Sequence, residues 1–433
     1  MVIIHVDDIA LCSSSPEGLQ GLIDCFCAYC AEHGLVVNPS KCAVMVFGAA
    51  NAWAGRRAWS IPAAEHGDRR PLPVVDEVTY LGLEVHGAAR SFRACADHRL
   101  GRMKATQAAI RGRLKDLRAP HDPSIVAGLF ASITAAAGSY ACEIWATSFL
   151  HAWHLKSDEC ALHALQATVY KRCLGLPRAA ASLLALFEVG RYPLQVQWLS
   201  RTVRYWNKLA RLAPGSSLLA DVFAANVAGG LEHGWGDTWV HELRAGLQFV
   251  CPDVAWTPHM LQGRTIDVRT VVSSAQHAFC RQLLAFTGAP GADDCVHRHF
   301  CKYATHMVLG GAGEDHDCLP RPAYIGATAP LARKQALARL RLSCAPVQTN
   351  LARGVPYSAR LCTRCAVGVP DTEHHFLFDC PALSAVRAPF LNDLPLADRD
   401  LAALMSGVYD GGRVHRVLKF VSRMTKAISG PTA

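Results

Sequence analysis

The chain begins with two short apolar runs on either side of a pair of carboxylates, Asp7 and Asp8. Both runs, residues 2–6 and 9–12, contain the β-branched residue types that favour strands. Two such runs around a short polar step predict a buried β-hairpin with the aspartates at its tip. Because adjacent carboxylates are costly to bury unless they are paired or bind a metal ion, the hairpin is also a candidate metal site.

The periodicity becomes helical after the hairpin. Apolar residues recur at three- and four-residue intervals over residues 16–34, and Ser15 can cap this helix. A strand is expected over residues 43–47 and a second apolar hairpin over residues 78–85. The stretch between them, residues 49–73, is rich in Ala, Gly, Arg and Pro and is expected to be a surface insertion. Strands and a helix together predict a small α+β unit.

From residue 93 onward the pattern is mainly helical. Residues 93–118 carry an apolar stripe together with eight Lys or Arg residues and two Asp residues. Further helical patterns cover residues 125–137, 153–174 and 193–212. The predicted fold class is therefore α+β, with a small N-terminal strand-containing unit followed by a mainly α-helical chain.

The composition limits the classes of protein to which this chain can belong. The 433 residues are 51% hydrophobic and 18% charged, as expected for a folded protein. The net charge of +9 permits a nucleic-acid partner but does not establish one. The sequence has no apolar run long enough for a membrane span, and the apolar N-terminus is interrupted by carboxylates, unlike a signal peptide. The 18 cysteines have no framework spacing, so we expect reduced thiols in an intracellular protein, nuclear or cytoplasmic.

A second candidate metal site lies near the C-terminal end. Cys362 and Cys365 form a Cys-x2-Cys pair, and His375 and Cys380 complete four ligands of the types that zinc prefers. The spacing is then Cys-x2-Cys-x9-His-x4-Cys, a strong zinc pattern. His374 is the alternative histidine ligand, and with it the spacing becomes Cys-x2-Cys-x8-His-x5-Cys. Buried thiols around a short helix are the alternative to a zinc site.

A weaker cysteine and histidine cluster precedes this site. Cys295, His297, His299 and Cys301 alternate along the chain and would share one face of a strand, with His306 beyond them. Their spacing lacks the paired arrangement of common zinc modules. Ordinary helix or loop residues are the simpler interpretation.

Several of these motifs, in this order, resemble one family. The runs Val-Asp-Asp-Ile-Ala-Leu (6–11), Gly-Leu-Val-Val-Asn-Pro-Ser-Lys-Cys (34–42), Val-Met-Val-Phe (44–47) and Tyr-Leu-Gly (80–82) are similar to the palm of non-LTR (LINE-type) retrotransposon reverse transcriptases. The terminal cysteine and histidine segment is similar to the zinc knuckle of the same family. Its Glu-His-x-Leu-Phe-x-Cys-Pro run matches residues 373–381 with one extra histidine, which aligns His375 with the family's ligand.

The resemblance implies a division of the chain into five segments. They are a partial reverse transcriptase palm at 1–90, a helical thumb and connector at 91–213, a helical or irregular region without an assigned role at 214–336, a zinc-knuckle segment at 337–390 and a C-terminal helical tail at 391–433.

The family is an RNA-directed DNA polymerase that uses Mg²⁺. By resemblance, Asp7 and Asp8 are its second acidic motif, with Asp7 as the direct metal ligand. His5 replaces the aromatic residue that the family places before this pair. The family's first metal-binding aspartate lies upstream of this hairpin, so we expect a truncated chain that is inactive alone as a polymerase. Two ions bridged by carboxylates are needed to activate the primer hydroxyl and stabilise the leaving group.

The basic helix corresponds to the thumb by this resemblance, and RNA and DNA in a template–primer duplex are the expected partners. The alternative is that its cations form only the solvated face of an amphipathic helix. As functional alternatives, the chain is a non-catalytic zinc-dependent nucleic-acid-binding protein or a decayed product without a role. The candidate phosphate contacts are Arg102, Lys104, Arg111, Arg113 and Lys115.

Overall fold

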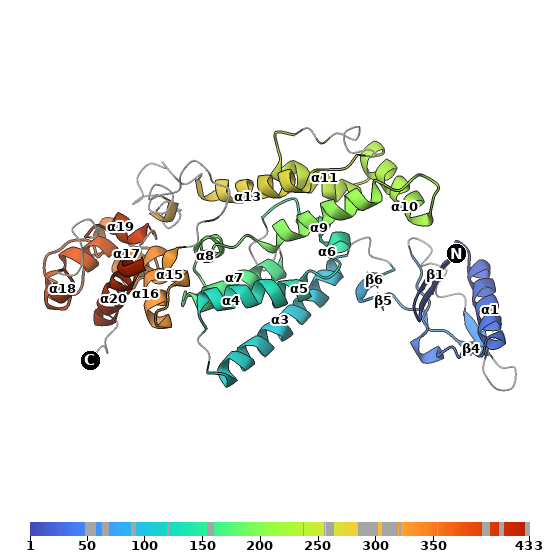
Figure 1. The fold of residues 1–433 in the computed structure, drawn as a ribbon, viewed down its shortest axis with the longest axis horizontal. Coiled ribbons are helices and arrows are strands. Elements are labelled where there is room, and N and C mark those ends of the chain that lie inside the picture. The colour runs from blue at the N-terminus through green and yellow to red at the C-terminus, as the bar shows by residue number, and fades with distance from the viewer. Residues whose placement is uncertain are drawn as a thin grey trace. The chain divides into compact units, whose positions relative to one another are not determined.

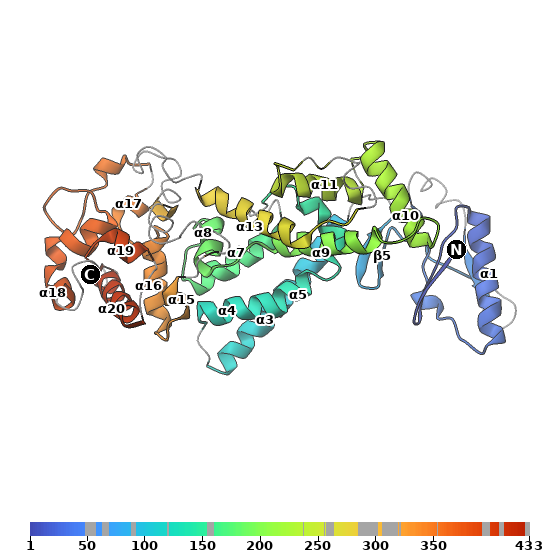
Figure 2. The same cartoon turned by 45° about the horizontal axis from the view of Figure 1, so that its top comes forward.

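The computed structural model describes most of the chain. The described part is mostly helical with three two-stranded antiparallel sheets, which agrees with an α+β fold in general (Figures 1 and 2). The described residues are 1–47, 58–62, 69–87, 92–118, 121–153, 160–236, 238–254, 256, 264–284, 302–304, 319, 322–352, 354–391, 399–406 and 411–428.

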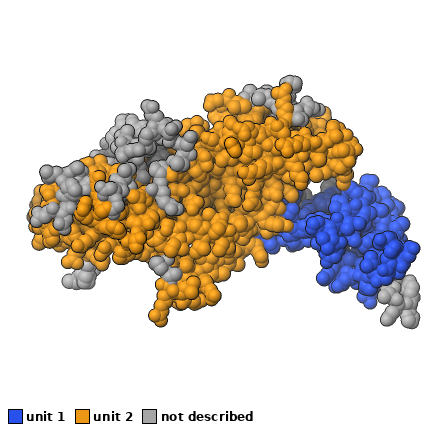
Figure 3. Space-filling model, viewed as in Figure 1, with its two compact units in different colours: residues 1–98 blue, residues 99–433 orange. Residues whose placement is uncertain are grey.

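The chain divides into two compact units, residues 1–98 and 99–433 (Figure 3). The predicted division at residue 90 lies near this boundary. The other divisions expected from the sequence fall inside the second unit, where the segments pack together.

The first unit begins with the predicted hairpin, formed by β1 (Val2–His5) and β2 (Asp8–Leu11). The strands pair with His5 opposite Asp8, and Val6 and Asp7 form the turn. Every residue of β1 is exposed, so the expectation of a buried hairpin is wrong. The reason is that β1 pairs with β2 alone, and a two-stranded sheet cannot cover both of its faces by itself.

The helix after the hairpin is α1 (Pro16–Glu32). Its first turn is capped as the sequence predicts, because the Ser15 hydroxyl accepts a hydrogen bond from the Gly18 N–H at 3.1 Å. At the other end Gly34 has a φ of 66°, a conformation that glycine adopts without a Cβ clash.

The core of the first unit corrects two sequence-based expectations. Residues 49–73 are not simply a surface insertion, because Trp59, Ile61 and Leu72 are buried against Ile23 of α1. The predicted strand at 43–47 shrinks to one bridge between Val44 and Val74. The remaining elements of this unit are η1 (Pro39–Lys41), the hairpin of β3 (Ser60–Pro62) with β4 (Arg69–Pro71), and the predicted second hairpin of β5 (Glu77–Tyr80) with β6 (Leu83–His86).

The second unit is mainly helical in its described part. It includes most of the predicted basic helix, α3 (Arg93–Asp116), which is continuous over 24 residues. The other helices up to residue 284 are α4 (Pro123–Leu129), η3 (Phe130–Thr134), α5 (Ala135–Gly138), α6 (Cys142–Trp145), η4 (Ala146–Phe149), α7 (Ala161–Cys173), α8 (Ser182–Val189), α9 (Leu194–Leu209), α10 (Leu218–Val227), η5 (Ala228–Glu232), α11 (Trp239–Val250) and α13 (Val268–Leu284).

The second unit also includes the helices that follow residue 322. Those nearer the C-terminal end are α15 (Ala323–Gly326), α16 (Leu331–Arg341), α17 (Gln348–Leu351), η6 (Tyr357–Ala359), η7 (His375–Asp379), η8 (Pro381–Leu383), α18 (Ser384–Leu391), α19 (Leu401–Met405) and α20 (Gly411–Ile428).

Buried ion pairs join these two groups of helices. The Glu188 carboxylate of α8 accepts hydrogen bonds from Arg341 Nε of α16 at 2.6 Å and from the Tyr303 hydroxyl at 2.8 Å, and both charged side chains are fully buried. The Lys334 ammonium of α16 pairs with Asp122, directly before α4, and donates to the Ile325 carbonyl at 3.0 Å. Because each charge is paired and hydrogen-bonded, burial is tolerated, and α16 is held in one position.

One apolar pair of helices in this unit has the composition of a broken membrane span. Among the described residues no single helix is long and apolar enough to cross a membrane. The segments Pro123–Gly138 and Cys142–Phe149 satisfy the length and composition criteria together, with a bend of 65° between them. In the folded unit their residues Ala127, Phe130 and Trp145 are buried inside the protein.

Candidate metal centre

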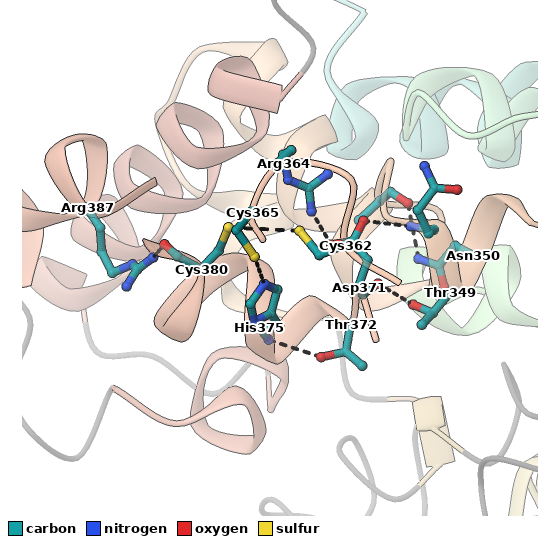
Figure 4. A network of polar contacts seen from close by, with 12 residues as sticks. Thr349, Asn350, Cys362, Arg364, Cys365, Asp371, Thr372, His375, Cys380 and Arg387 are labelled. Atoms are coloured by element: carbon teal, nitrogen blue, oxygen red, sulfur yellow. Dashed lines mark hydrogen bonds and ion pairs between the residues drawn. The ribbon is translucent and has the colours of Figure 1, made fainter. Parts of the chain in front are cut away.

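The first half of the site is a tight loop that presents two thiols. Leu361 and Pro370 form an antiparallel bridge, and the Cys362 N–H donates to the Val369 carbonyl at 2.9 Å. Gly368 turns the chain back with a φ of 73°, which favours glycine. This loop therefore brings Cys362 and Cys365 to one side (Figure 4).

The second half comes from the chain directly after the loop. The Thr372 hydroxyl accepts a hydrogen bond from the His375 N–H at 3.0 Å and so caps the first turn. The chain then forms η7, a π-helical turn in which hydrogen bonds join residues five apart. The Cys380 N–H accordingly donates to the His375 carbonyl at 2.7 Å. One wide turn thus directs His375 and Cys380 toward the loop.

The four predicted ligands meet in one place. Cys362 Sγ lies 4.0 Å from Cys380 Sγ, and Cys365 Sγ lies 3.4 Å from His375 Nε2. All four ligand atoms lie within 4.8 Å of one another. A tetrahedral zinc ion with bonds of about 2.3 Å to sulfur and about 2.0 Å to nitrogen separates its ligand atoms by roughly 3.5–3.8 Å. The donor set and its spacing therefore fit a metal ion such as zinc.

The structure separates the two adjacent histidines. His375 is buried within the cluster, whereas the His374 side chain is 51% exposed and its Nδ1 lies 2.8 Å from the Asp379 carboxylate. Consecutive residues on a helical turn point in directions about 100° apart, so only one of them can face the thiols. That residue is His375, the one that the sequence motif favours.

The two loop thiols differ in their electrostatic surroundings. Burial raises the pKa of Cys362 to about 11, against the effect of nearby backbone N–H groups. For Cys365 the backbone N–H of Val367 is the largest influence and lowers the pKa. Zinc binds thiolates, so a bound metal would replace the Cys362 proton, and the N–H groups in this loop stabilise the charge that results.

Buried polar contacts anchor the loop to the neighbouring helix α17. The Asp371 side chain is fully buried, pairs with Arg364 and accepts a hydrogen bond from the Gln348 N–H at 2.8 Å. The Thr349 hydroxyl donates to the Asp371 carbonyl at 2.8 Å. Sequence analysis did not identify Asp371, because its partners Gln348 and Thr349 lie more than 20 residues earlier and only the folded chain brings them together.

A second buried carboxylate supports the histidine turn. Glu373 is 2% exposed, pairs with Lys302 and accepts a hydrogen bond from Asn350 Nδ2 at 2.9 Å. Burial favours its neutral form, but the charge and hydrogen bond of Lys302 outweigh burial and lower the Glu373 pKa. The Glu-His order in the sequence was the only signal for this residue.

A buried cation lies beside the cluster, next to the backbone of Cys380. Arg387, from α18, is 6% exposed and donates hydrogen bonds to the backbone carbonyls of Phe378 and Cys380. Three thiolates, a neutral histidine and Zn²⁺ together carry a net charge of −1. The Arg387 guanidinium, bound to the backbone of one ligand, would compensate this charge when zinc is bound, and it fixes the Cys380 position as outer-sphere partners do in metal sites.

The two aspartates of the N-terminal hairpin have a different environment. Asp7 and Asp8 are both exposed, as expected for carboxylates at the rim of a small sheet. In the described part of the chain no third His, Cys, Asp or Glu joins them to form a metal-binding group. Asp7 and Asp8 are consecutive residues, and the described part of the structure brings no further ligand to them.

The basic helix α3 presents its candidate contacts to solvent. Met103, Gln107 and Leu114 are buried along one side of the helix. This side packs into the second unit, where Gln107 donates a hydrogen bond to the Thr134 hydroxyl. The five predicted phosphate contacts, Arg102, Lys104, Arg111, Arg113 and Lys115, are all exposed.

The weaker cluster of Cys295, His297, His299 and Cys301, with His306, lies outside the described residues. Comparisons of the chain with protein-family models, with curated proteins and with solved structures give no match. The site geometry, together with the motifs, is therefore the basis for assigning a function.

Proposed function

We propose that this protein binds nucleic acid in a zinc-dependent way and derives from a non-LTR retrotransposon reverse transcriptase. The observation that carries the proposal is the convergence of Cys362, Cys365, His375 and Cys380 at distances suited to one zinc ion. A Cys₃His set of this kind binds zinc as a closed, structural site without an open position for a substrate. Zinc therefore acts here by holding a binding surface in shape.

The finer domain assignment belongs to the same proposal. Residues 1–90 correspond to part of the palm, α3 to the thumb helix and residues 337–390 to the zinc knuckle. The exposed cations of α3 support a nucleic-acid partner, because phosphate backbones attract Lys and Arg side chains and release counterions on binding. RNA and DNA of a template–primer duplex share this chemistry.

Metal analysis of the purified protein tests the zinc site. We expect one zinc ion per chain in the wild type and its loss in Cys362→Ser. The matched control is His374→Ala, which removes the neighbouring exposed histidine and should leave the zinc content unchanged. Loss of zinc in the control, or no zinc in the wild type, would contradict the assignment.

Binding of RNA and DNA duplexes at several salt concentrations tests the partner. Replacing Arg111 and Arg113 by Gln should weaken binding and reduce the slope of log affinity against log salt by about 2, one unit for each lost phosphate contact. Replacing Arg172 and Arg178, two exposed arginines outside α3, removes the same charge and should leave the slope unchanged. No binding by the wild type at low salt would reject the proposal.

Polymerase activity is the second candidate function. Its supporting observation is the pair of accessible carboxylates, Asp7 and Asp8, next to each other on a hairpin, where carboxylate oxygens suit Mg²⁺. Primer extension on an RNA template with Mg²⁺ tests it. Synthesis that Asp7→Ala abolishes would establish a polymerase, whereas no synthesis by the wild type would leave the binding function alone.

A further inference from the structure

Helix α20, Gly411–Ile428, has two faces of opposite character. One face is buried and apolar, and it packs on α15, α16, α18 and η7 behind the zinc cluster. Figures 1 and 2 both show α20 next to α16. The buried apolar residues are Val414, Val417, Leu418, Phe420, Val421 and Met424, each at most 5% exposed.

The opposite face is a row of cations, which we call the α20 stripe. Arg416, Lys419, Arg423 and Lys426 are all exposed. They are three, four and three residues apart, so they lie along one side of the helix. With a rise of about 1.5 Å per residue, the row extends over roughly 15 Å.

The described elements that pack most extensively against α20 supply little negative charge to the α20 stripe. Residues 411–428 contain no Asp or Glu, and neither do α15, α16 or α18, which pack against α20. The fourth neighbour, η7, contains Asp379, whose carboxylate lies 2.8 Å from His374 Nδ1. An ordinary solvated helix face mixes both signs of charge, whereas this one attracts polyanions.

We propose that the α20 stripe is a second docking surface for the phosphate backbone of RNA or DNA, distinct from α3. Each nucleic-acid strand carries one charge per about 3.4 Å of its axis, so a 15 Å row of cations faces several phosphates. This proposal rests on the proposed nucleic-acid binding and adds a surface to it. Because α20 packs beside η7, zinc would hold this surface in place.

An anionic membrane fits the α20 stripe less well. Helices that bind membranes insert an apolar face below the headgroups. The apolar face of α20 is already occupied by the protein core, with Phe420 fully buried and its ring centroid 6.1 Å from that of Phe378 in η7. The exposed face offers charge without an apolar residue to insert.

Salt-dependent binding by the full chain tests the proposal. The variant carries Arg416→Gln, Lys419→Gln and Arg423→Gln, substitutions that keep helix propensity. We expect binding to fall on the order of 10- to 100-fold at moderate salt and the salt slope to decrease by about 2 to 3. The matched control replaces the exposed Arg172, Arg178 and Arg204 by Gln, which removes equal charge from other positions.

Further measurements separate the possible outcomes. Circular dichroism and zinc content show whether the triple variant is folded, and a variant with Arg416→Lys and Arg423→Lys should retain binding because it keeps the charge of both positions. Equal loss in the triple variant and its control, or unchanged binding in the triple variant, would overturn the α20 proposal while leaving the proposed function intact. Absence of wild-type binding contradicts both. Binding of phosphatidylserine vesicles but not RNA or DNA would replace nucleic acid by a membrane.

Discussion

The two candidate metal sites of this protein differ in what surrounds their ligands. At the N-terminal hairpin, Asp7 and Asp8 are exposed, and β1 behind them is exposed in every residue. At the Cys₃His cluster, Asp371 is fully buried and Arg387 is 6% exposed, and both hold the ligand-bearing backbone. A ligand motif defines which atoms can bind, but the supporting residues decide whether these atoms are held in binding geometry.

The same contrast holds for the ion pairs of the two units. Asp24 and Arg69 in the first unit form a pair with side chains 45% and 44% exposed. Glu188 and Arg341 in the second unit are fully buried. Water screens the first pair, whereas the second is held in a dry interior where each charge depends on its partner. The second unit therefore depends much more strongly on individual polar contacts than the first.

Zinc removal should have the largest effect and would sharpen this contrast most. Chelation, or Cys380→Ser, leaves buried thiols without their shared ion, and structural zinc binds with roughly 10 kcal/mol or more in zinc-finger peptides. We expect loss of hydrogen-exchange protection over residues 361–391 and a lower melting temperature. Combined Asp7→Ala and Asp8→Ala should change the free energy of unfolding by no more than about 0.5 kcal/mol, since both residues are exposed. A comparable loss in the aspartate variant would remove the distinction between the sites.

Breaking the buried pair of the second unit should have the next largest effect. Arg341→Met leaves the Glu188 carboxylate buried without its cation, which costs about 3–5 kcal/mol. Urea denaturation measures this change, and Arg172→Met, at an exposed arginine, provides the control. A loss below about 1 kcal/mol would show that the Tyr303 and Tyr324 hydroxyls, which also donate to Glu188, satisfy it alone.

The pH dependence of stability should show the smallest effect and compares one carboxylate from each unit. Burial favours neutral Asp122, but hydrogen bonds from Lys334 and Ser124 outweigh it and lower the Asp122 pKa. A depressed pKa contributes stability above the unfolded value of about 3.9, and this contribution is lost as pH falls through the folded value. The Asp24 pKa is also lowered, chiefly by its hydrogen bond from Arg69.

Urea midpoints between pH 6 and 3 measure both contributions. Asp122→Asn should remove about 1–3 kcal/mol of stability at pH 6 and flatten the acid dependence. Asp24→Asn should change stability by less than about 1 kcal/mol, because the exposed pair is screened by solvent. Equal effects of the two variants would contradict the division between a screened and a buried pair.

Local features of the fold could be predicted from neighbouring residues. The start of α1 follows from Ser15 and Pro16, and the long α3 from its apolar stripe and its lack of proline. The β5–β6 hairpin follows from its two apolar runs around Gly82, whose φ is 76°. These elements are stabilised by contacts within a few residues, so a short window contains the information.

Features that depend on distant contacts could not be predicted in the same way. The burial of Trp59, Ile61 and Leu72 arises from packing against α1, which a composition rich in Ala, Gly, Arg and Pro conceals. The expected strand at 43–47 had suitable residues, but within the described residues it is reduced to a single bridge between Val44 and Val74. Strand formation needs a neighbour in space, and residue type alone does not supply one.

The sequence by itself determined the ligand types, their spacing and the positive charge of α3, because these are properties of short segments. The tertiary structure decided that His375 rather than His374 faces the thiols and that Arg387 lies beneath Cys380. It also paired Glu188 with Arg341, which lies 153 residues later in the chain. Side chains so far apart meet only when the core around them has packed, since the cost of bringing them together is compensated by burial and not by any local preference.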